Sequence, residues 1–161
     1  MLEKTGLASR DMFEKLLPSP ERRKKGPYAV MECYEKIPCN PCVTSCPAHA
    51  VTMASINDMP CCDQNICTGC TRCVSRCPGL ACFVIDETVG NDQITITLPY
   101  ELTPLPAKGD QVAALDREGK EVGIAEVVRI MSSQALDHTN VITIKVDKSL
   151  QIGRASCRER V

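Results

Sequence analysis

The chain has 161 residues, a formal net charge of −1 and 3 % aromatic residues, with no Trp. The stacking platforms that single-strand nucleic-acid binders use are therefore missing, and nucleic acid is not an expected partner. We see no apolar run of membrane length and no export segment, so the sequence predicts no membrane span and a cytoplasmic location.

Residues 1–27 form a basic arm with seven basic and four acidic side chains. Ser9 is a candidate N-cap for a short amphipathic helix, whose apolar side contains Leu7, Met12, Phe13, Leu16 and Leu17. The basic run at residues 22–25 predicts a solvated segment. We expect the helix to pack on its own domain; a partner-docking helix with a basic latch is the alternative.

Eight cysteines form two runs, Cys33-x5-Cys39-x2-Cys42-x3-Cys46-Pro47 and Cys67-x2-Cys70-x2-Cys73-x3-Cys77-Pro78. The second run matches the bacterial iron-sulfur spacing at every position. Three thiolates at this spacing wrap one cluster, while the fourth, turned away by the proline, reaches the other. The sequence therefore predicts two 4Fe-4S clusters, one held by Cys33, Cys39, Cys42 and Cys77 and the other by Cys67, Cys70, Cys73 and Cys46.

Residues 28–90 resemble a bacterial-type dicluster ferredoxin domain. The resemblance is carried by the Cys-Thr-Gly-Cys-Thr-Arg-Cys stretch from Cys67, the two Cys-Pro pairs, and the Ala50-Val51 and Ala81-Cys82 pairs that follow them. It implies a pseudo-twofold α+β fold with two short helices and two antiparallel hairpins around the clusters. The candidate strands are residues 28–33, 51–54, 60–63 and 83–86.

The first run departs from the family pattern, because Lys36 stands where the first ligand normally lies. The chain after Cys33 must loop out for that thiol to reach iron. If it cannot, the site would hold a three-iron cluster or borrow Cys61 or Cys62. Otherwise we expect Cys61, Cys62 and Cys82 to pack as small apolar side chains.

Two other interpretations of the cysteines fit the sequence less well. A zinc ribbon could use Cys39, Cys42, Cys67 and Cys70, but it would leave the remaining cysteines of the runs and the prolines unexplained. A disulfide framework fits poorly with paired C-x2-C spacing and no signal peptide. His49, beside Cys46-Pro47, is a candidate to tune a cluster, although a surface histidine is the more common case.

Residues 91–151 change to alternating apolar and polar positions, which predict a small β-barrel or sandwich of four or five strands. One apolar face contains Ile94, Ile96, Leu98, Ile142, Ile144 and Val146, and a third strand adds Val122, Ile124, Val128 and Ile130. Residues 116–120 are the turn between strands at 111–115 and 122–131. We find no catalytic constellation here.

Residues 152–161 resemble a sequencing-adapter read-through, which would make Cys157 foreign and the native C-terminus missing.

Full ligation by four thiolates favours electron transfer over substrate chemistry, so we expect no catalytic site of the chain's own. The sequence predicts a ferredoxin-like carrier, or the iron-sulfur subunit of a larger flavin-dependent oxidoreductase. Residues 28–90 carry three basic and six acidic side chains, which predicts docking on a basic patch of a redox protein such as a flavoprotein dehydrogenase. A redox- or iron-sensing regulator is the alternative.

Overall fold

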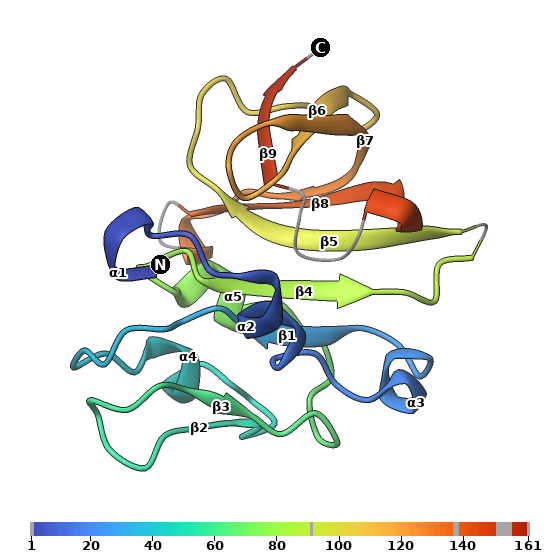
Figure 1. Cartoon of the computed structure of the whole chain (residues 1–161). Coiled ribbons are helices and arrows are strands. Elements are labelled where there is room, and N and C mark those ends of the chain that lie inside the picture. The colour runs from blue at the N-terminus through green and yellow to red at the C-terminus, as the bar shows by residue number, and fades with distance from the viewer. Residues whose placement is uncertain (1, 91, 137–138, 151–155, 161) are drawn as a thin grey trace.

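The computed structural model describes residues 2–90, 92–136, 139–150 and 156–160 (Figure 1). The fold mixes short helices with sheet, and strands predominate. The helices are α1 (Leu2–Thr5), α2 (Arg10–Glu14), α3 (Pro20–Arg23), α4 (Pro41–Thr44) and α5 (Arg72–Arg76), with 3-10 turns η1 (Gln134–Leu136) and η2 (Lys148–Leu150). None of the helices in these ranges is long and apolar enough to cross a bilayer.

The cysteine-rich part has its four strands where the sequence predicted them. They are β1 (Tyr28–Met31), β2 (Val51–Thr52), β3 (Cys61–Cys62) and β4 (Cys82–Asp86). Strand β1 pairs antiparallel with β4, and β2 pairs antiparallel with β3. Each short helix begins inside a C-x2-C segment, so that α4 contains Cys42 and α5 contains Cys73, and the two helices pack against each other.

The remaining strands extend the sheet that β1 and β4 begin. They are β5 (Gln93–Tyr100), β6 (Gln111–Leu115), β7 (Glu121–Met131), β8 (Asn140–Asp147) and β9 (Ser156–Arg160), and the strand order is β1-β4-β5-β8-β7-β6-β9. Neighbouring strands are antiparallel throughout. The boundary predicted near residue 91 falls between β4 and β5, which are hydrogen-bonded neighbours, so the sheet runs across it.

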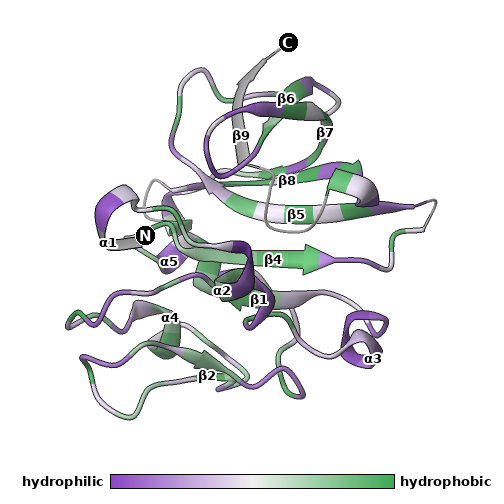
Figure 2. Cartoon of the chain, viewed as in Figure 1, coloured by the Kyte–Doolittle hydropathy of each residue, from purple (hydrophilic) through white to green (hydrophobic). Residues whose placement is uncertain are grey.

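The core of the second part of the chain, which begins at β5, was predicted from the alternation of apolar and polar residues. The prediction is correct for two of the three strands. The side chains predicted to face inward on β5 and β8 are all buried: Ile94, Ile96, Leu98, Ile142, Ile144 and Val146. Cross-strand pairs such as Ile96 with Ile144 stack these side chains on one face. Figure 2 shows the apolar residues alternating with polar ones along β5 and β8.

The prediction for β7 was partly wrong. Ile124 is 55 % exposed, whereas Ala125 and Val127 are fully buried. The pairing of β7 shifts register twice, near Leu115 and again beyond Val127. Each bulge inserts one residue and so moves the following side chains to the opposite face. A regular period of two cannot reveal this reversal.

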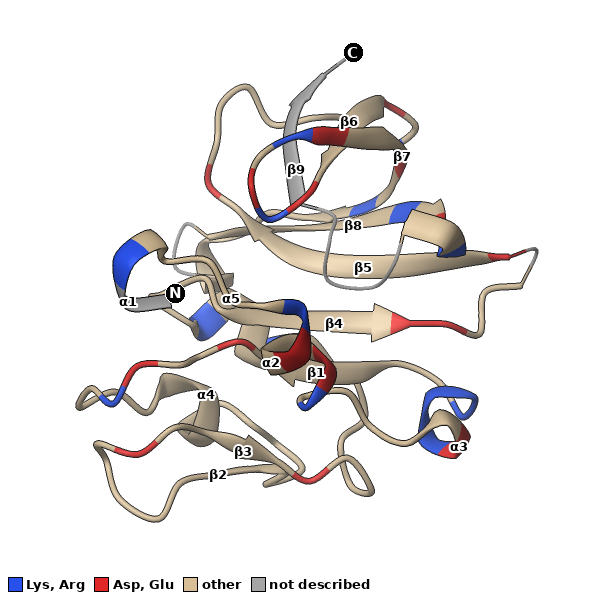
Figure 3. Cartoon of the chain, in the orientation of Figure 1, with Lys and Arg blue, Asp and Glu red and all other residues tan. Residues whose placement is uncertain are grey.

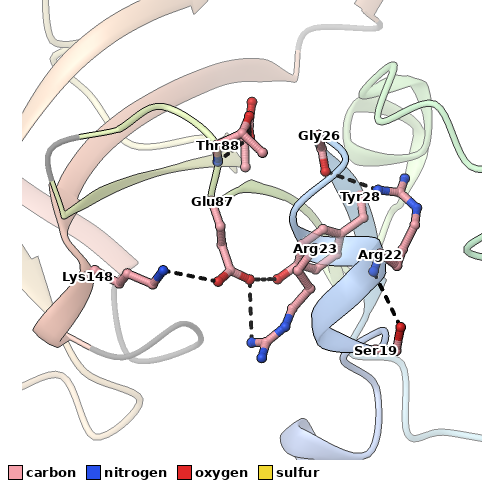
Figure 4. Close-up of polar contacts among 9 residues, drawn as sticks. Ser19, Arg22, Arg23, Gly26, Tyr28, Glu87, Thr88 and Lys148 are labelled. Atoms are coloured by element: carbon pink, nitrogen blue, oxygen red, sulfur yellow. Dashed lines mark hydrogen bonds and ion pairs between the residues drawn. The ribbon is translucent and has the colours of Figure 1, made fainter.

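The N-terminal arm packs on its own domain, as expected. Ser9 caps α2 by accepting a hydrogen bond from the backbone N–H of Met12, and Phe13 is buried against Tyr28, Val30 and Ile85. The prediction that residues 22–25 are solvated was wrong for its first half. Arg22 and Arg23 are half-buried, and Arg23 lies 3.4 Å from Glu87, which also accepts the Tyr28 hydroxyl at 2.7 Å (Figure 4).

Arg117 joins the β6–β7 turn to the rest of the molecule. Its guanidinium bonds both carboxylate oxygens of Glu32, just after β1, and lies 4.9 Å from the centre of the Phe13 ring. A bidentate pair of this kind is among the stronger charged contacts. The arm, the cysteine-rich part and the second part therefore meet at one side chain.

Candidate metal centres

Two small cavities divide the cysteines into two sets of four. The first cavity, with an empty volume of about 360 Å³, is bordered by Cys33, Cys39, Cys42 and Cys77. The second, of about 330 Å³, is bordered by Cys46, Cys67, Cys70 and Cys73. These are the sets that crossed ligation predicts, because each takes three thiols from one run and the fourth from the other. Four thiols are the donor set of a 4Fe-4S cluster.

Cys33 lies at the first cavity despite its unusual spacing. The chain after β1 leaves the sheet, and Glu35 and Ile37 border the same cavity. The thiol of Cys33 is 4.0 Å from the carbonyl oxygen of Glu35. Neither Cys61 nor Cys62 is among the described residues that border this cavity. The substitute ligands considered from the sequence are therefore placed elsewhere.

The two Cys-Pro turns have the same geometry. The backbone N–H of Ala50 donates to the sulfur of Cys46 at 3.3 Å, and the N–H of Ala81 donates to the sulfur of Cys77 at 3.3 Å. The residue just before each alanine has a φ of 52°. The same backbone turn therefore places an N–H against one sulfur of each run.

This repetition extends over the whole cysteine-rich part at a spacing of 31 residues. Cys39, Cys42 and Cys46 match Cys70, Cys73 and Cys77 at that spacing. By the same rule Lys36 matches Cys67, and Lys36 is exposed. The first cavity therefore takes its remaining thiol from Cys33, which lies just after β1 and before Lys36. The 31-residue spacing between the other cysteines is unchanged.

Two further thiols lie against the cavity sulfurs. Cys82 is 1 % exposed, borders the first cavity, and lies within hydrogen-bonding reach of Cys42, Cys73 and Cys77. The Cys82 thiol also lies 3.2 Å from the sulfur of Met31, which is a further acceptor, and since a thiol has one proton it donates to one of these sulfurs at a time. Cys62 lies beside Cys67 in the same way. The expectation of packed thiols is confirmed for Cys82, but it was wrong for Cys61, which is exposed.

These contacts change the acidity of the sulfurs that border the cavities. The hydrogen bond from Cys82 lowers the pKa of Cys77 to about 6, and the bond from Cys62 lowers the pKa of Cys67. Burial raises the pKa of Cys33 and of Cys39. Metal ligands must be deprotonated, so the sulfurs with lowered pKa bind metal at the smallest cost.

The N-terminal arm holds the loop that carries Cys67. Arg22 donates from its guanidinium to the backbone carbonyls of Gln64, Gly26, Pro27 and Cys67. The amide of Gln64 donates to the carbonyl of Ala29, whose own N–H reaches the Cys67 sulfur at 3.4 Å. Sequence reasoning missed Arg22 and Gln64, because backbone carbonyl acceptors leave no signal in the residue pattern.

The four cysteines of a zinc-ribbon site are split between the two cavities. Cys39 and Cys42 border the first and Cys67 and Cys70 border the second. Among the described residues, no group of three or more His, Cys, Asp or Glu surrounds a single-ion position. The thiolates of a four-iron cluster each bind a different iron and so stand farther apart than the ligands of one ion. His49 is exposed and borders neither cavity.

No family model, curated protein or solved structure matches this chain. The interpretation of the two cavities therefore rests on their own geometry. What that geometry offers is two separate sets of four thiols, one with Cys42 of α4 and the other with Cys73 of α5, and these two helices pack against each other.

Proposed function

We propose that this chain is an iron-sulfur electron-transfer protein with two 4Fe-4S clusters in a ferredoxin-type dicluster fold. One observation carries the proposal: each cavity is bordered by the four thiols that crossed ligation assigns to it. The β1–β4 and β2–β3 pairings and the repeated Cys-Pro turns support it. When bound, each cluster exchanges one electron with little rearrangement.

The chain's own residues hold the two cavities close together. Cys42 and Cys73, from different cavities, both lie within reach of the Cys82 thiol. Val74 and Val84 are buried in the same apolar core as these cysteines. Cys42 and Cys73 are buried, and solvent access to the sulfurs is one of the features that set cluster potential.

The partner that we propose is a flavoprotein dehydrogenase, with this chain as its iron-sulfur subunit in the cytoplasm. The second part of the chain supports a subunit role, because it extends the sheet well beyond the cysteine-rich part without adding a cysteine in β5, β6, β7 or β8. Copurification of a flavin-containing protein with the tagged chain would test this. Reversible partner release on exposure to air, without electron transfer, would instead favour a sensor.

The cluster content is tested by anaerobic purification followed by iron, sulfide and zinc analysis and low-temperature EPR. We expect about eight irons and eight sulfides per chain, and interacting S = 1/2 signals after reduction. Zinc as the sole bound metal would refute the proposal. A brown protein with about four irons per chain would restrict the proposed cluster binding to one of the two cavities.

A further inference from the structure

A third and larger cleft lies beside the second cavity. Its empty volume is about 1430 Å³, and it opens between α4, α5 and η1. The described residues that border it are Pro41, Thr44, Ser45, Cys46, Pro47, His49, Arg72, Ser75, Arg76, Ala135 and Leu136. Cys46 is the residue that this cleft shares with the second cavity, so one ligand residue separates the cleft from that centre.

The cleft carries positive charge from one half of the internal repeat. Arg72 and Arg76 lie one turn apart on α5, and the residues 31 positions earlier, Pro41 and Ser45, are uncharged. His49 also borders the cleft. Among the described residues that border the cleft, none is acidic. Figure 3 shows basic residues on α5.

The first cavity opens toward a different kind of surface. Glu35 and Asp58 border it, and Ile37, Ile56 and Met59 on the same two loops are each about half exposed. Figure 3 shows acidic residues on both of these loops. The described residues that border the first cavity thus include two carboxylates, with the exposed Lys36 on the same loop as Glu35, whereas those that border the cleft include two arginines and no carboxylate.

We propose that the cleft bordered by Arg72, Arg76 and His49 is the docking surface for an acidic redox protein, which exchanges electrons with the second centre past Cys46. This rests on the proposed function and reverses the docking polarity that the net charge predicted. Charge complementarity carries it, because a concave surface lined by one sign of charge concentrates partners of the opposite sign.

The direct test measures electron transfer to small oxidants of opposite charge. The reduced, cluster-containing chain loses one electron, and either anionic Fe(III)-EDTA or cationic hexaammineruthenium(III) gains it, with no bond made or broken. Arg72→Glu reverses one charge at the first residue of α5, where a carboxylate is favourable for the helix, so the variant should fold. Arg76 is left in place because it bonds the carbonyl of Ala135.

At low ionic strength, Arg72→Glu should lower the rate constant with Fe(III)-EDTA on the order of tenfold and leave the rate with the ruthenium complex equal or higher. The difference should shrink as salt shortens the screening length below about 10 Å. Lys108→Glu is the matched control, since it makes the same charge change on an exposed turn before β6. It should change both rates by less than about twofold.

An acidic flavodoxin serves as the protein probe. If its reduction also slows with Arg72→Glu but not with Lys108→Glu, the docking proposal is supported. If only Fe(III)-EDTA responds, the cleft takes small anions and the proposal is overturned, as it is if neither probe responds. Iron content and EPR are measured first in every variant, so a chain without clusters would refute the proposed function and not the docking surface.

Discussion

The guanidinium of Arg22 donates a hydrogen bond of 2.8 Å to the backbone carbonyl of Cys67, 45 residues further along the chain. Three more bonds from the same side chain, to Gln64, Gly26 and Pro27, fix the arm against the loop that carries this cysteine. The segment that the sequence predicted to be a charged arm therefore supports the backbone of a residue that borders the second cavity.

Arg22→Lys should weaken this attachment, because an ammonium cannot reach four carbonyls arranged around a planar fork. Bonds from charged donors contribute about 1.5 to 3 kcal/mol each, so we expect a loss of about 2 to 4 kcal/mol in the free energy of unfolding. Denaturant unfolding of the cluster-containing protein measures it. Lys24→Ala is the control, since Lys24 is exposed in the same run. An equal loss in both variants would contradict the role of Arg22.

Gly69→Ala should separate the arm from the same loop. A Cβ at Gly69 would lie 2.6 Å from the Cβ of Pro27, and the φ of +65° disfavours any side chain. We expect a destabilisation of about 1 to 3 kcal/mol. Gly79→Ala is matched to it, because nothing lies within 4 Å of its added Cβ and its φ is not positive. Thermal unfolding of the pair tests this, and similar midpoints would count against the close contact.

Cys33→Ser should convert the first centre to a three-iron cluster, since Cys33 supplies one of its four thiols. The iron content should fall from about eight to about seven, and an EPR signal should appear in the oxidised protein. Cys61→Ser, at an exposed thiol outside both cavities, should keep the full content. Adding Lys36→Cys to Cys33→Ser should restore it, because position 36 matches Cys67 in the repeat. Full iron in Cys33→Ser alone would show that another ligand is used.

Removing iron should unfold the cysteine-rich part first. Its core is built around the cysteines, whereas the core of β5, β6, β7 and β8 consists of aliphatic side chains and Tyr100 and contains no cysteine. Metal-thiolate bonds provide much of the stability of such small domains. Hydrogen exchange after chelation should show loss of protection in β2 and β3 and retained protection in β5 and β8. Uniform loss would indicate that both parts unfold together.

Tyr28 should make stability fall at high pH. Burial, with the hydrogen bond to Glu87, raises its pKa well above the usual value of about 10. The unfolded chain therefore loses the phenol proton near pH 10 while the folded chain keeps it, so stability is present below pH 10 and declines above it. Tyr28→Phe should cost about 1 kcal/mol at pH 8, and this gap should narrow above pH 10. Denaturant unfolding at both pH values measures it, and a constant gap would contradict the raised pKa.

Part of the C-terminal tail, residues 156–160, also pairs in the sheet. Strand β9 pairs with β6, with Ser156 opposite Leu115, while residues 152–155 and 161 lie outside the described residues. The expectation that residues 152–161 are foreign to the protein stays a prediction. Sequencing of the gene's 3′ end would decide it.

The strand positions and the capped helix after Ser9 could be predicted because each depends on residues close together in the chain. The cysteine spacing predicted the two sets of four thiols that border the cavities, and their use as cluster ligands stays a prediction. Cysteine spacing fixes which thiols can surround one cluster, and alternation fixes which face of β5 and β8 is buried. The alternation rule holds where a strand is regular and fails where a bulge interrupts it, as in β7.

The bulges in β7, the clamp formed by Arg22 and the basic cleft beside Cys46 were decided by tertiary structure alone. Each depends on segments far apart in sequence meeting in space, often through backbone groups that every residue carries. Net charge shows the same limit: the sequence gives its total for residues 28–90, but only the tertiary structure places Arg72 and Arg76 at the cleft and Glu35 and Asp58 at the first cavity.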